Sequence, residues 1–151
     1  MDDRKYLEIE EAQIIWRNFS GAPSKYNADG ERNFCVVLKD NVEYEKLIEE
    51  GWNAKVREPD GEDPLFYLKV KVNVDGKYPP RIKMIFGDKA VDVDRNNIEL
   101  LDGADIRYCD MVISPYEWEM NGNKGIAAYL KELYVICNTS RIGEKYTQYD
   151  E

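Results

Sequence analysis

Aromatic rings and guanidinium groups gather at two places early in the chain. The segments are Trp16-Arg17-Asn18-Phe19 and Arg32-Asn33-Phe34, so the triplet Arg-Asn-Phe occurs twice. Ring faces stack on nucleobases, and guanidinium groups bind phosphates. In a hairpin, these segments would bring two cations and three rings to the mouth of one loop, which makes them candidate nucleic-acid-binding residues. The alternative is that the rings belong to the core and that the arginines pair with nearby carboxylates.

The flanking sequence predicts that hairpin. Residues 12–19 and 33–39 are rich in the β-branched and aromatic side chains that are typical of strands. Between them, residues 20–23 and 27–30 supply the Gly, Pro, Asn and Asp that turns require. We therefore expect strand, loop and strand over residues 14–39.

A second group of cations lies on a strictly alternating segment, residues 65–74. One face carries Phe66, Leu68, Val70, Val72 and Val74, and the other carries Tyr67, Lys69, Lys71 and Asn73. This alternation predicts a half-buried strand. Its polar row can follow a phosphate backbone. The alternative is that the row is the solvated face of an antiparallel sheet.

Two further features complete the candidate site. Residues 81–86 alternate in the same way and put Arg81 and Lys83 on a second cationic edge, while Trp118 offers another ring. Each stacked base contributes about 1–3 kcal/mol to binding. The expected nucleic-acid-binding residues are Trp16, Arg17, Phe19, Arg32, Phe34, Tyr67, Lys69, Lys71, Arg81, Lys83 and Trp118.

The charge distribution bears on this hypothesis. The 151-residue chain has a net charge of −9, which by itself disfavours phosphate binding. Residues 64–89, however, carry six lysines and arginines against two aspartates. A protein can present one basic groove within an acidic, soluble exterior. The alternative is a solvated mosaic of charges without function.

Several classes of chemistry find no support. The chain has no histidine, and Cys35, Cys109 and Cys137 are far apart within apolar runs, which disfavours His-dependent nucleophiles, disulfide frameworks and zinc sites. No glycine-rich phosphate loop is present. We expect neither an enzyme nor a cofactor. A metal-assisted nuclease built on Asp88, Asp92, Asp94 and Glu99 is a weak rival, and an acidic protein that mimics DNA and inhibits a host nucleic-acid enzyme is a stronger one.

Length and composition predict one domain over residues 1–137, followed by a polar tail, residues 138–151. No signal peptide or membrane-spanning run is evident, so we expect a cytoplasmic protein. Many short strands, one helix over residues 41–51 and a turn at 121–125 predict a mainly antiparallel β-barrel like the oligonucleotide-binding (OB) fold. That fold typically has its helix between the third and fourth strands, so the earlier helix here indicates an elaborated variant. Residues 115–120, with a proline, should form an exposed edge, through which two copies could pair.

The chain resembles phage-encoded single-stranded DNA-binding proteins of the OB fold. The resemblance is carried by residues 15–21, 30–34, 47–53, 79–80, 100–102 and 114–118. It implies sequence-tolerant binding of single strands in DNA replication or recombination, in the host cytoplasm, with replication or recombination proteins as further partners. Such proteins often recruit partners through an acidic tail, and residues 138–151 are only weakly acidic.

Overall fold

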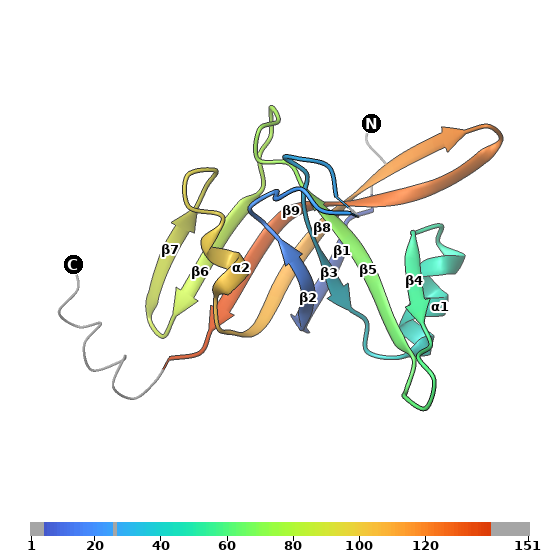
Figure 1. Cartoon of the computed structure of the whole chain (residues 1–151), viewed down its shortest axis with the longest axis horizontal. Helices are drawn as coiled ribbons and strands as arrows, with labels where there is room; N and C mark the ends of the chain where they lie inside the picture. Colours follow the sequence, from blue (N-terminus) through green and yellow to red (C-terminus); the bar gives the residue numbers. More distant parts are fainter. Residues whose placement is uncertain (1–4, 26, 140–151) are drawn as a thin grey trace.

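The computed structural model describes residues 5–25 and 27–139 of the chain (Figure 1). Its elements are β1 (Leu7–Ala12), β2 (Ile14–Asn18), β3 (Arg32–Val37), α1 (Asn41–Glu49), β4 (Ala54–Arg57), β5 (Leu65–Val72), β6 (Arg81–Phe86), β7 (Lys89–Val93), α2 (Leu100–Gly103), β8 (Ile106–Met120) and β9 (Asn123–Cys137). The predicted hairpin, helix and alternating strands are all present.

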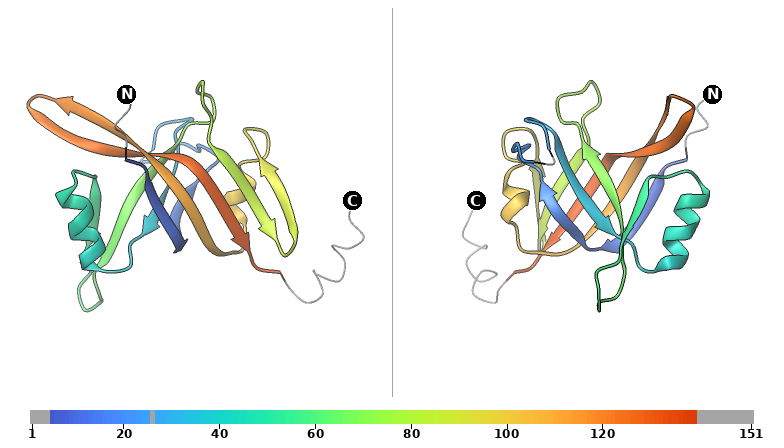
Figure 2. Two further views of the ribbon diagram at one scale, coloured as in Figure 1. Left: turned by 180° about the vertical axis from the view of Figure 1, so that it is seen from behind. Right: turned by 45° about the vertical axis from the view of Figure 1, so that its right-hand side comes forward.

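The strands form one strongly twisted sheet (Figure 2). The main path is β1-β8-β9-β5-β3-β2; β4 pairs with β5, and β6 pairs with β7 and β9. All pairings are antiparallel except β5 with β9 and β6 with β9. The OB-like, mainly antiparallel architecture is confirmed, although the sheet is not closed into a barrel. Its ends, β1 and β2, are joined in the chain by Gln13.

Strand β5 shows why this sequence forms a two-faced sheet. Leu68, Val70 and Val72 are buried in the core, whereas Lys69 and Lys71 between them are exposed. Full burial of a Val or Leu side chain stabilises the fold by about 1.5–3 kcal/mol, so a one-residue slip in register would be costly. The core therefore holds the cationic row on the outer face.

Helix α1 starts at Asn41, as predicted, and ends at Glu49, two residues before the predicted end at Gly51. The Asp40 side chain accepts a hydrogen bond of 3.0 Å from the backbone N–H of Glu43. Gly51, with φ of +97°, turns the chain after the helix. Its carbonyl then accepts a 2.9 Å hydrogen bond from the N–H of Ile126, and the N–H of Asn53 donates to the Ile126 carbonyl. These bonds tie the α1–β4 segment to β9.

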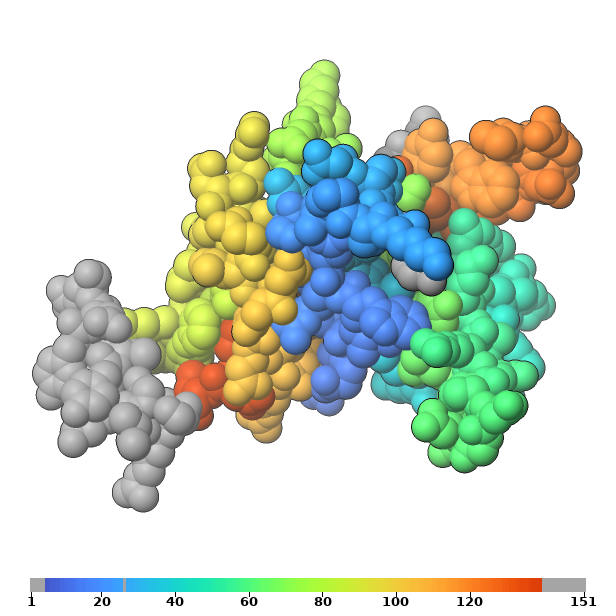
Figure 3. All heavy atoms as spheres, in the orientation of Figure 1, coloured from blue at the N-terminus to red at the C-terminus, as the bar shows by residue number. Residues whose placement is uncertain are grey.

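Strands β8 and β9 form a long hairpin that projects from the body of the molecule (Figures 1 and 3). Strand β1 pairs with β8 only as far as Ile113. Pro115 follows that point, in a stretch of β8 that pairs with β9 alone among the described residues, so it lies in an edge segment as the sequence predicted. The hairpin turns at Asn121 and Gly122, which both have positive φ.

Strand β9 ends at Cys137, at the predicted end of the last strand. Most of the predicted polar tail, residues 140–151, lies outside the described residues. Within the described residues, no helix is long and apolar enough to cross a membrane.

Candidate nucleic-acid interface

The two Arg-Asn-Phe triplets do come together, but mainly as structural elements. Phe19 and Phe34 are fully buried, and their rings stack with centroids 5.2 Å apart. Because neither ring is accessible, neither can stack on a base in this structure. The structure places both in the core, as the alternative interpretation of the triplets expected.

The arginines of the triplets bind the backbone. Arg17 donates hydrogen bonds of 2.9 and 2.8 Å to the carbonyls of Leu101 and Ala104, around the end of α2. Arg32 donates a 2.6 Å hydrogen bond to the carbonyl of Phe19. Backbone carbonyls, rather than carboxylates, thus occupy these guanidinium groups, which hold the strand ends and α2 together.

Asp102 of α2 also holds the end of β2 in place. Its carboxylate accepts hydrogen bonds from the N–H groups of Phe19, at 2.6 Å, and Ser20, at 3.1 Å. The loop after β2 is then closed by Gly30, whose N–H donates to the carbonyl of Gly21 at 2.8 Å. A Cβ on Gly21 would lie 3.1 Å from the backbone of Gly30, which explains glycine at this close approach.

Trp16 lies on the outer face, unlike the phenylalanines. The pairing of β2 with β3 shifts between Ile15 and Asn18, and within this bulge Trp16 has φ of +51°. Its side chain is 49% exposed, and its ring packs edge-on against Tyr67 with centroids 4.9 Å apart. The bulge therefore places an accessible aromatic pair at one end of the cationic row of β5.

The cationic row of β5 lines a groove with β9. Two adjoining hollows of about 360 and 230 Å³ share Lys69, Lys71 and Tyr129. The other side chains that line them include Asn53, Lys55, Tyr116, Trp118, Glu31, Arg32 and Asn33. We call the two hollows together the lysine groove. It exists because β5 and β9 pair in parallel, with Lys71 beside Tyr129.

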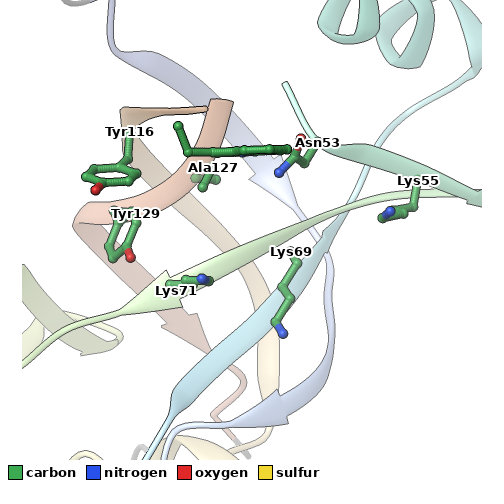
Figure 4. Close-up of a pocket in the computed structure, with 9 residues that line it drawn as sticks. Asn53, Lys55, Lys69, Lys71, Tyr116, Ala127 and Tyr129 are labelled. Carbon is green, nitrogen blue, oxygen red and sulfur yellow. The ribbon is translucent and has the colours of Figure 1, made fainter. Parts of the chain in front are cut away.

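Rings and cations line different parts of the lysine groove: Tyr116 and Tyr129 lie next to one another, and Lys71, Lys69 and Lys55 extend away from them along β5 and β4 (Figure 4). The Tyr116 and Tyr129 rings lie 5.6 Å apart, and Lys71 Nζ lies 5.8 Å from the Tyr129 centroid. In the part of the chain that the structure describes, no carboxylate forms an ion pair with Lys55, Lys69 or Lys71. Their charges are therefore available to an anionic ligand.

Trp118 enters the groove from the projecting hairpin, opposite Gly125 on β9. A Cβ added to Gly125 would lie 2.9 Å from the Trp118 ring and 2.8 Å from the Asn53 side chain. Real Cβ atoms essentially never make contacts that short, so glycine leaves the space that the indole and the Asn53 side chain occupy here. The position of Trp118 thus depends on both β8, which carries it, and β9, which carries Gly125.

The remaining two candidates do not line the lysine groove itself. Arg81 lies in a neighbouring hollow beyond Tyr129. Lys83 forms an ion pair of 3.3 Å with Asp92 across β6 and β7. Of the eleven predicted residues, four line the groove: Arg32, Lys69, Lys71 and Trp118. Two more, Trp16 and Tyr67, form the aromatic pair at its end. The structure therefore brings together the two regions that the sequence singled out.

Among the polar and aromatic residues that line the larger of the two hollows, sequence reasoning missed four: Asn53, Lys55, Tyr116 and Tyr129. Tyr116 stands in a segment that carried the family resemblance, but its position gave no sign of a groove. Tyr129 is outward-facing between the buried Ala128 and Leu130, an alternation visible in the sequence. Only the parallel β5–β9 pairing, which links distant segments, shows that it faces Lys71.

Two of the four carboxylates of the nuclease hypothesis have structural partners instead. Asp92 pairs with Lys83, and Asp94 accepts a 2.9 Å hydrogen bond from the N–H of Asn96. Among the residues that the structure describes, no three His, Cys, Asp or Glu side chains form a group that could hold a metal ion. The geometry gives that rival no support.

The cysteines are core thiols. All three are buried, and burial raises the pKa of Cys35 to about 11 and that of Cys109 to about 12. Lys69 opposes the shift at Cys35 because it lies beside it on the next strand. At neutral pH both groups are therefore protonated, and they contribute packing rather than reactivity.

Comparison with known proteins agrees with this geometry. A family model described as "Putative phage ssDNA-binding domain" matches residues 2–151. No curated protein matches the chain.

Solved structures of a single-stranded DNA-binding protein from bacteriophage Enc34 are similar in fold. Its C-terminally truncated form aligns with a TM-score of 0.58 at 11% identity, over 89% of this chain and 87% of that one. Its complex with single-stranded DNA aligns with a TM-score of 0.56, also at 11% identity, over 89% and 88% of the two chains. The match of the family model to nearly the whole sequence shows that the chain belongs to the family of phage single-stranded DNA-binding domains.

Proposed function

We propose that the chain binds single-stranded DNA along the lysine groove, in phage DNA replication or recombination. Family membership supports the ligand. The observation that supports the path is the set of three lysines, free of carboxylate partners among the described residues, that line one hollow together with the rings of Tyr116, Tyr129 and Trp118. A structure of the Enc34 protein contains single-stranded DNA, which agrees with this choice of ligand.

The proposed path runs along β5. It begins at the Trp16–Tyr67 pair, passes Lys69 and Lys71, and reaches Tyr129 on β9. Rings stack on any base, since every base has a π-face, and ammonium groups bind phosphates as point charges. The groove therefore favours sequence-tolerant binding. It also favours single strands, because the bases of a duplex are stacked on one another and do not present their faces.

Two further features of this role are part of the proposal. The protein acts by binding, without catalysis, in the cytoplasm of the host. The rival role as a DNA mimic requires a surface of carboxylates in place of phosphates, whereas the lysine groove carries three lysines and Arg32 against Glu31. An exposed cationic face would repel the basic site of a host enzyme.

Fluorescence anisotropy with labelled oligo-dT, and with a duplex of equal length, across a salt series tests the proposal. We expect preference for oligo-dT, with log K falling by about 0.7 per phosphate contact for each unit of log salt. Equal affinity for the duplex would contradict the stacking mechanism. If the protein does not bind oligo-dT at low salt, the proposed function is wrong, and the DNA-mimic hypothesis becomes the better one.

A further inference from the structure

A third hollow, of about 670 Å³, adjoins the lysine groove beyond Tyr129. It lies between the loop that joins β5 to β6 and the outer face of β9. Tyr129 lines all three hollows, and Asn73 lines both this hollow and its neighbour in the groove. The surface is therefore continuous from the lysine groove into this third hollow, which we call the β5–β6 pocket.

The β5–β6 pocket has rings that the fold does not use. Tyr78, at the tip of the loop, is 85% exposed, and Lys77 Nζ lies 5.7 Å from its ring centroid. Tyr6 is 44% exposed, with Lys131 Nζ only 4.2 Å from its centroid. Large rings this exposed contribute little to folding, whereas rings beside ammonium groups are the elements that bind nucleotides.

The charges of the pocket also suit a phosphate. Arg81 and Lys131 are exposed on neighbouring strands, β6 and β9. Glu132, which follows Lys131 on β9 and pairs in register with Arg81 on β6, accepts a 2.6 Å hydrogen bond from the Tyr134 hydroxyl, and this bond raises the pKa of that tyrosine. Glu132 is thus partly satisfied by a neutral donor, and it offsets only one of the two cations.

We propose that the β5–β6 pocket is a second binding subsite, which takes the part of the same DNA strand that continues past Tyr129. Arg81 and Lys131 bind a phosphate there, and Tyr78 stacks on a base. This inference rests on the proposed function, because the strand arrives from the lysine groove. It makes the binding site longer than the face formed by β3, β5 and β9.

The inference predicts an effect that depends on the length of the DNA. A short oligonucleotide fills the lysine groove alone, whereas a longer one also reaches the pocket. We would compare wild-type protein with the double variant Tyr78→Ala, Arg81→Ala on oligo-dT from about 4 to about 16 nucleotides, the range of site sizes known for single OB domains. Lys46→Ala, which removes an exposed charge from α1 away from all three hollows, is the control.

We expect the double variant to lose roughly 25- to 750-fold in affinity for the longest oligonucleotides at about 0.1 M salt, which is about 5- to 150-fold for one stacked base multiplied by about fivefold for one phosphate contact. For the shortest ones, its affinity should stay within about twofold of wild type. The slope of log K against log salt should become shallower by about 0.7 on the long oligonucleotides only. The Lys46→Ala control should show none of these changes.

Two outcomes would overturn the inference while leaving the proposed function intact. One is an unchanged affinity of the double variant at every length. The other is an equal loss at every length, which would place these residues in the lysine groove itself. If wild-type protein binds no oligonucleotide, the proposed function itself fails. Circular dichroism and thermal unfolding of each variant show whether it is folded, and the exposed loop position of Tyr78 favours that.

Discussion

Neutralising Lys69 and Lys71 is the substitution that addresses the lysine groove most directly. Both side chains are exposed on β5, while the residues between and beside them, Leu68, Val70 and Val72, anchor the strand in the core. The double variant Lys69→Gln, Lys71→Gln therefore keeps the strand, its hydrogen bonds and the volume of the side chains. It removes only two charges from the proposed phosphate path.

The size of the effect follows from counterion release. Each phosphate contact on a single strand contributes a slope of about −0.7 to log K against log salt, which is about fivefold in affinity at about 0.1 M salt. Two contacts together predict a loss of about 25-fold at that salt concentration and a slope that is shallower by about 1.4. Because the effect is electrostatic, the two proteins should converge in affinity as the salt concentration rises.

Anisotropy titrations of labelled oligo-dT across a salt series measure both quantities. The matched control is Lys39→Gln, Lys46→Gln, which makes the same change in net charge near α1 and alters no residue of the three hollows. An unchanged slope in the Lys69, Lys71 variant would refute the reasoning. So would an equal loss in the control, because net charge rather than the groove would then determine affinity.

Four other predictions follow from particular contacts. Trp16→Gly should weaken oligo-dT binding by about 1–3 kcal/mol. Its free energy of unfolding in urea should stay within about 1 kcal/mol of wild type, because glycine adopts the positive φ of this position without strain. A large loss of stability would show that the ring is structural. Gly125→Ala should displace Trp118 and reduce the affinity for oligo-dT as much as Trp118→Ala does. Wild-type affinity in the Gly125→Ala variant would contradict the proposed role of Gly125 in positioning Trp118. Asp102→Ala should lower the free energy of unfolding by about 1–3 kcal/mol, because two backbone N–H groups lose their acceptor; the variant should bind oligo-dT normally at temperatures where it is folded. Burial raises the pKa of Cys35 from 9.0 to about 11, so the thiol's contribution to the free energy of unfolding is complete below pH 9 and declines as the pH rises toward about 11. In urea unfolding at alkaline pH, Cys35→Ala should therefore lose less stability with rising pH than the wild type does.

Local patterns in the sequence predicted most of the fold. The alternation over residues 65–74 predicted both faces of β5, and the caps expected at Asp40 or Asn41 and at Gly51 predicted the ends of α1 to within two residues. Pro115 marked the free edge of β8. Each of these signals acts within a few residues of the chain, where periodicity, capping and the missing N–H of proline act directly on the backbone.

The candidate site was only partly predictable, because ring and cation types do not reveal burial. Phe19 and Trp16 are three residues apart in one aromatic segment, yet Phe19 is fully buried and Trp16 is 49% exposed. The β-bulge at Trp16 turns its side chain outward, and no residue type in the segment predicts a bulge there. Arg17 was expected to bind phosphate but binds the carbonyls of Leu101 and Ala104, more than eighty residues away. Contacts of that kind depend on the tertiary fold.

The position of Tyr129 illustrates the same limit for pairing. The sequence shows that β9 is a long strand, but its parallel pairing with β5 is set by how the whole sheet folds. That pairing brings Tyr129 to Lys71 and makes the lysine groove continuous with the β5–β6 pocket. The site is thus a property of the sheet rather than of any one segment.

Photo-crosslinking tests the central claim, the path of the DNA, most directly. Oligo-dT with 5-iodouracil at single positions would be irradiated on the protein, and the crosslinked residues would be identified by mass spectrometry. The account predicts crosslinks to Tyr129, Tyr116, Trp118 and the Trp16–Tyr67 pair, because the halogenated base reacts with the rings on which it stacks. Crosslinks confined to α1 or to β7, outside the lysine groove and the β5–β6 pocket, would contradict it.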